Sequence, residues 1–83
     1  MPRYFFDTHD GEFHRDDEGS EQADFEAARK EAMIFLPEVA RWEIPKDGDH
    51  RSFSVFVRDE SGAIVYTGTL TYSGLRLTST DKS

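Results

Sequence analysis

The clearest pattern in the chain is an alternation of apolar and polar side chains over residues 52–58. Phe53, Val55 and Val57 take every second position of this segment. A period of two is typical of a strand that buries one face against a core. The positions between them carry the side chains of the opposite face: Ser54, Phe56 and Arg58. The segment is therefore predicted to be a strand with Phe53, Val55 and Val57 facing inward.

A second alternating segment follows over residues 63–72, after a turn that ends in Gly62. Glycine adopts the positive φ that such a turn requires, so the two segments are predicted to form a hairpin. Gly68 interrupts the second segment and indicates a bulge there. Four apolar residues define its inward side: Ile64, Tyr66, Leu70 and Tyr72.

The N-terminal part predicts another hairpin. Residues 3–8 have the composition of a strand, and Asp10-Gly11 is typical of a two-residue type I′ turn. A short return strand is expected over residues 12–15, followed by an acidic, solvated loop over residues 16–21.

Residues 24–44 predict a helical segment. Asp24 is suited to cap its first turn, because a carboxylate accepts hydrogen bonds from the free N–H groups there. Pro37 predicts a break or kink near Leu36 and is also suited to be the first residue of a second short helix through Trp42. The bent segment is expected to end before Pro45. Its apolar stripe consists of Phe25, Ala28, Ala32, Phe35, Leu36 and Val39.

These elements predict an α+β domain of order ββαββ, a four-stranded antiparallel sheet with one bent helical segment packed on one face. The domain is expected to span residues 1–77, with a flexible polar tail over 78–83. The order of the two hairpins in the sheet stays open. The inner face is predicted to comprise Tyr4, Phe6, Phe53, Val55, Val57, Ile64, Tyr66 and Leu70, and the outer face to include Phe5, Phe56 and Val65.

The same residues resemble a known family. The resemblance covers most of the chain, to about Tyr72, and rests on the following segments: Pro2-Arg3-Tyr4-Phe5-Phe6-Asp7, Asp10-Gly11, Asp16-Asp17-Glu18-Gly19, Asp24, Ala28-Arg29-Lys30-Glu31-Ala32, and Val57-Arg58-Asp59 with Gly62. The chain is similar to short, stand-alone bacterial proteins grouped as a domain of unknown function. This resemblance implies a small independent domain and no particular activity, cofactor or site.

Composition narrows the functional classes. The 83 residues include no cysteine, which excludes disulfides and thiolate chemistry and fits a reducing compartment. No apolar run resembles a signal peptide or a membrane span, so a cytoplasmic protein is predicted. The net charge is −7, and residues 1–24 hold eight acidic against two basic side chains. This charge argues against binding to nucleic acid or to an anionic membrane.

Candidate chemistry is sparse. His9, His14 and Asp16 lie around the first predicted hairpin, and imidazole and carboxylate groups are possible ligands of a transition metal. Their spacing matches no known metal motif, and no serine lies in a nucleophile motif. These absences argue against an enzyme, and no cofactor is predicted. A small metal-dependent enzyme or metal binder that uses this hairpin stays an alternative.

The main functional prediction is a small protein-interaction or regulatory module that binds a protein partner or a second copy of itself. Phe5 and Phe56 on the outer face, and Trp42 near the end of the helical segment, are candidate contacts because large rings are common in interfaces. The acidic loop residues Asp16, Asp17 and Glu18 are further candidates, since they favour a basic partner. An acidic decoy for a nucleic-acid-binding protein is the other alternative.

Overall fold

The computed structural model describes residues 1–47 and 49–77, so the predicted tail over 78–83 lies outside the described residues. One long helix and a sheet of short and long strands make up this part of the chain. The elements are β1 (Arg3–His9), β2 (Phe13–His14), β3 (Ser20–Glu21), α1 (Phe25–Asp47), β4 (His50–Arg58) and β5 (Ile64–Ser73). The predicted α+β class with one helix on an antiparallel sheet is confirmed.

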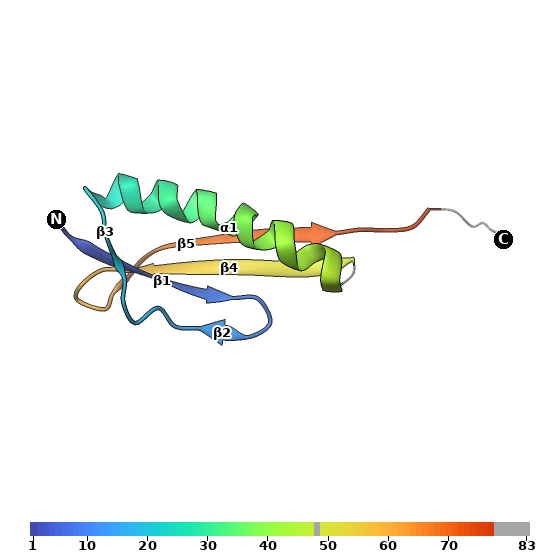
Figure 1. Ribbon diagram of the computed structural model, residues 1–83, viewed down its shortest axis with the longest axis horizontal. Coiled ribbons are helices and arrows are strands. Elements are labelled where there is room, and N and C mark those ends of the chain that lie inside the picture. Colours follow the sequence, from blue (N-terminus) through green and yellow to red (C-terminus); the bar gives the residue numbers. More distant parts are fainter. Residues whose placement is uncertain (48, 78–83) are drawn as a thin grey trace.

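The sheet has the order β2-β1-β4-β5, and β3 pairs with the start of β1. All of these pairings are antiparallel. The α1 helix lies along one face of the sheet, where it contacts β4 and β5 (Figure 1). The fold therefore has two layers, with the helix on one side of the sheet only.

The core lies between α1 and the centre of the sheet. Phe53, Val55 and Val57 of β4 are at most 1% exposed, as their alternation predicts. Each such side chain stabilises the fold by about 1.5–3 kcal/mol through its removal from water. The helix contributes mostly small residues to this core: Ala28, Ala32, Leu36 and Ala40. Tyr4, Phe6, Tyr66 and Leu70 pack around its margin, also as predicted.

The β5 strand departs from the prediction at its start. A bulge lies opposite Val57 and Arg58, because Val57 pairs with Tyr66 whereas Arg58 pairs with Ile64. The extra residue reverses the alternation of side chains. Ile64 consequently joins the face that carries Arg58 and is 61% exposed, so its predicted place in the core is wrong.

Gly68 does not mark a bulge either, since it pairs with Val55 in the regular ladder. An added Cβ at Gly68 would lie 3.6 Å from Leu36 Cδ1 and 3.7 Å from Val55 Cγ1. Gly68 thus lies on the helix side of β5, next to the core.

The helix is longer than predicted. It continues through Pro37 and Pro45 as a single element, so the expected second helix at Pro37 and the end before Pro45 are wrong. Asp24 caps the helix as predicted: its Oδ1 accepts the N–H of Ala27 at 2.9 Å. Buried residues both before and after Pro37 pack on β4, and this packing offsets the missing hydrogen bond.

The first hairpin has a longer turn than predicted. His9 pairs with Phe13, which leaves three residues, 10–12, in the loop instead of two. Gly11 has the positive φ, 103°, that this turn requires. The expected acidic loop also contains a short strand, β3, which pairs with Arg3 and Tyr4. Together β2 and β3 cover both ends of the outer edge of β1.

Candidate functional site

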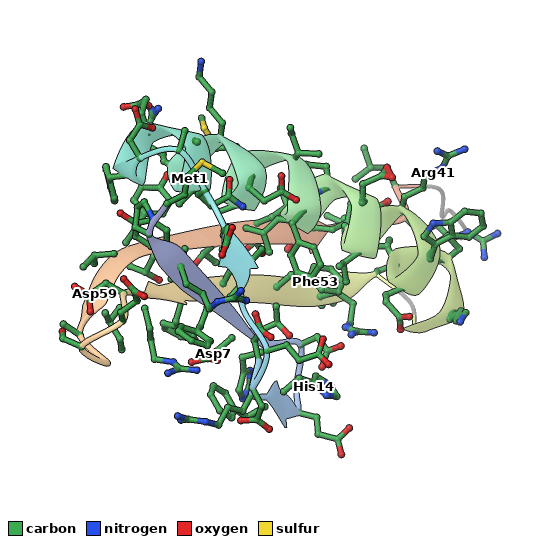
Figure 2. The ribbon with its side chains drawn as sticks, turned by 60° about the vertical axis from the view of Figure 1, so that its left-hand side comes forward. Met1, Asp7, His14, Arg41, Phe53 and Asp59 are labelled. Atoms are coloured by element: carbon green, nitrogen blue, oxygen red, sulfur yellow. The ribbon has the colours of Figure 1, made fainter. Side chains whose placement is uncertain are left out.

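A buried ion pair occupies the face of the sheet opposite α1. Arg58 Nε donates to Asp7 Oδ2 at 2.7 Å, and Arg58 Nη2 donates to Asp7 Oδ1 at 3.1 Å. The Asp7 side chain is 5% exposed and that of Arg58 is 11% exposed. Figure 2 shows Asp7 on the side of the sheet away from the helix. The two strands β1 and β4 are thus joined by a bidentate pair as well as by their ladder.

Asp16 extends this pair into the loop that precedes β3. Its backbone N–H donates to Asp7 Oδ1 at 2.9 Å, and its backbone oxygen accepts from Arg58 Nη2 at 2.9 Å. Its carboxylate accepts the backbone N–H of Phe6 at 3.0 Å, and also those of Glu18 and Gly19. Asp16 therefore satisfies the edge of β1 between β2 and β3, and it is not the solvated loop residue that the sequence predicted.

The electrostatics of this network favour both carboxylates in their charged form. Burial opposes the charge of Asp7, but hydrogen bonds from Arg58 and from the Asp16 N–H outweigh it and hold the pKa of Asp7 below its ordinary value. Burial likewise opposes the charge of Asp16, and the N–H groups of Gly19, Phe6 and Glu18 outweigh it, so the pKa of Asp16 is also lowered. The charged, hydrogen-bonded carboxylates of Asp7 and Asp16 therefore act as structural anchors.

Phe5 belongs to the same cluster. The Arg58 guanidinium lies 4.9 Å from the centre of the Phe5 ring, a distance typical of a cation–π contact. Gly19 approaches the ring from the loop: an added Cβ would lie 2.9 Å from two ring carbons. Phe5 is half-buried by these neighbours. The predicted partner contact at Phe5 thus falls on a ring that already has intramolecular cover.

The two histidines of the predicted metal site lie on opposite faces of the first hairpin. His14 pairs with Thr8 and His9 pairs with Phe13, so their positions differ by one residue in register. His9 Nδ1 accepts the N–H of Gly11 at 3.3 Å, and His14 Nε2 lies 3.5 Å from Asp10 Oδ1. Within residues 1–47 and 49–77, no group of three or more His, Asp or Glu side chains is arranged to hold a metal ion.

The other predicted contacts are distributed over the surface. Phe56 is half-buried on the outer face, where its neighbours in register are Asp7 and Thr67. Trp42 is 63% exposed on α1, with the Arg41 guanidinium 5.3 Å from its ring. Asp17 and Glu18 are exposed, and Asp17 pairs with Arg15 at 3.3 Å. The structure does not bring these residues together in one site.

An apolar hollow lies instead between α1 and β5. It has a volume of about 270 Å³, and Met33, Leu36 and Pro37 of the helix face Gly68 and Leu70 of the strand across it. A neighbouring hollow of about 360 Å³ shares Pro37 and Leu70 and continues to Tyr72. A third hollow is lined by Phe6, Asp16, Ser20, Glu31 and Phe35. Neither His9 nor His14 lines any of these three.

The sequence alone did not predict the ion pair between Asp7 and Arg58, or the apolar groove formed by the hollow between α1 and β5. Asp7 had one available signal, because a carboxylate at the centre of a strand of aromatic residues requires a buried cation. The groove had a weaker signal, since Gly68 in the middle of a strand indicates the close approach of another group.

The comparisons with known proteins give one result. The chain matches a family described as Domain of unknown function (DUF6894) over residues 3–71. No curated protein and no solved structure matches the chain. No helix in the described part of the chain combines the length and the hydrophobicity needed to cross a bilayer.

Proposed function

We propose that this chain, which belongs to the DUF6894 family, is a small interaction module that acts by binding another protein. The proposed binding surface, called the α1–β5 surface below, comprises Met33, Pro37, Gly68, Leu70 and Tyr72 together with the outer edge of β5. The absence of cysteine fits action in the cytoplasm.

The observation that carries this proposal is the apolar groove beside an open strand edge. The groove lining between α1 and β5 is almost entirely apolar, with Tyr66 and Thr69 as its polar members. Met33 is 51% exposed and Tyr72 is 43% exposed at its margin. Apolar side chains grouped around an open edge are typical of surfaces that bind another polypeptide.

Site-specific photo-crosslinking in cells that naturally produce the protein tests this proposal. A benzophenone amino acid would replace Met33 in one variant, and Glu60, which is exposed on the distant β4–β5 turn, in the control variant. We expect a protein adduct at position 33 and none at position 60, with the adduct identified by mass spectrometry. No adduct at position 33, or equal adducts at both positions, would contradict the proposal.

A further inference from the structure

The β5 strand presents its outer backbone groups to solvent. In the described part of the chain, β5 pairs with β4 and no strand lies beyond it. The N–H of Gly74 donates to the oxygen of Asp49 at 2.7 Å, in the same register as the β4–β5 pairs. Hydrogen-bonded pairs alternate along an antiparallel ladder. The N–H and C=O groups of Thr67, Thr69 and Thr71 therefore point away from β4.

This edge lacks the features that usually prevent strand pairing. The ten residues of β5 include no charged side chain and no proline, whereas natural edge strands commonly carry one or the other. The opposite edge of the sheet is treated differently, because β2, β3 and the Asp16 carboxylate cover β1. Among the described residues, one edge of the sheet is thus covered and the other is left open.

We propose that the open edge pairs with the β5 edge of a second copy, in an antiparallel arrangement with Thr69 next to the two-fold axis. This inference rests on the proposed function and names its partner. Both strands would present outward-pointing groups to each other at Thr69, and Thr67 would pair with Thr71 of the second copy. The result is a continuous sheet through both subunits.

The side chains of β5 match themselves in this register. Gly68 of each copy lies opposite Leu70 of the other, on the helix side of the sheet. Because Gly68 has no side chain and borders the apolar hollow, the opposing leucine has space to enter it. On the outer side threonines meet threonines, a pairing that stabilises antiparallel sheets. The extended segment that follows β5, with Leu75 82% exposed, would run alongside the Ile64 end of the second copy.

The charge distribution favours the same arrangement. Acidic side chains are concentrated in residues 1–24, which form β1, β2, β3 and their loops. The strand order places these elements at the edge farthest from β5. Two copies that meet at β5 therefore keep their acidic edges apart, which reduces the repulsion between two chains of charge −7 each.

Single-cysteine crosslinking tests the register, since the natural chain contains no cysteine. Hydrogen-bonded antiparallel neighbours have Cα atoms about 5.5 Å apart, within reach of a disulfide. Thr69→Cys is expected to give a covalent dimer on oxidation. Ser54→Cys is the matched control: Ser54 pairs with Thr69 on the same face, but two copies of it would be about 14 Å apart.

Light scattering of the purified protein tests the interface. The natural chain is expected to have twice the 9.5 kDa mass of one copy, and Thr69→Lys to halve that mass, because two ammonium groups would oppose each other. Ser52→Lys, with the same added charge on the outer face of β4, is expected to stay dimeric. A thermal melt checks that each variant folds. If Thr69→Lys does not fold, the Thr69→Cys crosslink tests the interface in its place.

A natural chain that stays monomeric at millimolar concentration would overturn this inference, as would a dimer that neither responds to Thr69→Lys nor crosslinks through Thr69→Cys. Either result leaves the proposed function standing if the Met33 adduct in cells contains a different protein. A missing adduct together with a crosslinked pure dimer would instead reject the cellular function and keep the interface.

Discussion

The guanidinium of Arg58 binds both carboxylate oxygens of Asp7, at 2.7 Å and 3.1 Å, across two neighbouring strands. The pair lies on the face of the sheet that α1 does not cover, and the loop at Asp16 closes over it. A two-layer fold with one helix leaves this face without a second apolar layer. The ion pair and its loop take over part of that role.

Removal of Asp7 should destabilise the protein strongly. Asp7→Ala leaves the nearly buried guanidinium of Arg58 without its carboxylate, and such a loss costs about 3–5 kcal/mol. Urea unfolding measures this change. Glu21→Ala is the control, because it removes an exposed partner of Arg3 at 3.6 Å, and an exposed pair contributes about 0–1 kcal/mol. Equal losses from the two substitutions would show that the Asp7 pair is not a structural anchor.

Stability should fall as the pH falls through the acid range. The pKa values of Asp7 and Asp16 lie below their ordinary value of 3.8 in the folded state, so the unfolded chain takes up protons first. The stability that these carboxylates contribute is complete above about pH 5 and is lost towards their folded pKa values. Urea unfolding between pH 7 and pH 2.5 measures the slope.

The matched variant for this pH dependence is Asp16→Asn, which removes one of the two titrating groups. We expect a lower stability at pH 7 and a shallower dependence on pH than in the natural chain. An unchanged slope would mean that Asp16 does not contribute to the acid sensitivity.

Gly19 should be far less tolerant of substitution than Gly11. Both have positive φ, 70° and 103°. A Cβ at Gly19 would lie 2.8 Å from the backbone oxygen of Tyr4, whereas nothing lies within 4 Å at Gly11. Gly11→Ala therefore measures the backbone strain alone, about 1 kcal/mol. Gly19→Ala should cost clearly more in the same urea experiment, and a smaller loss than for Gly11→Ala would contradict the close approach to β1.

Pro37→Ala should stabilise the helix. Alanine restores a backbone N–H in the middle of α1, and its helix propensity exceeds that of proline by about 3 kcal/mol in a helix interior. Pro37 is exposed, so little packing is lost. The expected result is a higher urea midpoint with more helical circular dichroism. A lower midpoint would indicate that the Pro37 ring contributes more packing than its exposure suggests.

Much of the fold was predictable because period-two patterns are strong where one face is buried. Phe53, Val55 and Val57 show this, and so does the Asp24 cap. The bulge at Arg58 was not predictable, since nothing in the alternation of residues 63–72 reveals an extra residue. The path of the helix through Pro37 was missed for a different reason. Local propensity opposes that path, and the packing of Ala32 and Ala40 on either side overrides it.

The site was harder to predict than the fold. His9 and His14 look close in the sequence of a hairpin, but a one-residue difference in register separates them onto opposite faces. Asp16 looks like a member of a solvated acidic loop, yet its oxygens accept N–H groups from β1 and from its own turn. The open edge of β5 depends on strand order, which the sequence left undetermined.

In the proposed dimer, the outward amides of β5 are the groups that bind the second copy. Amide hydrogen exchange, followed residue by residue at increasing protein concentration, tests it directly. Exchange at Thr67, Thr69 and Thr71 is expected to slow as the concentration rises, whereas Gly68 and Leu70, already bonded to β4, stay protected throughout. Fast exchange at the three threonines at every concentration would contradict it.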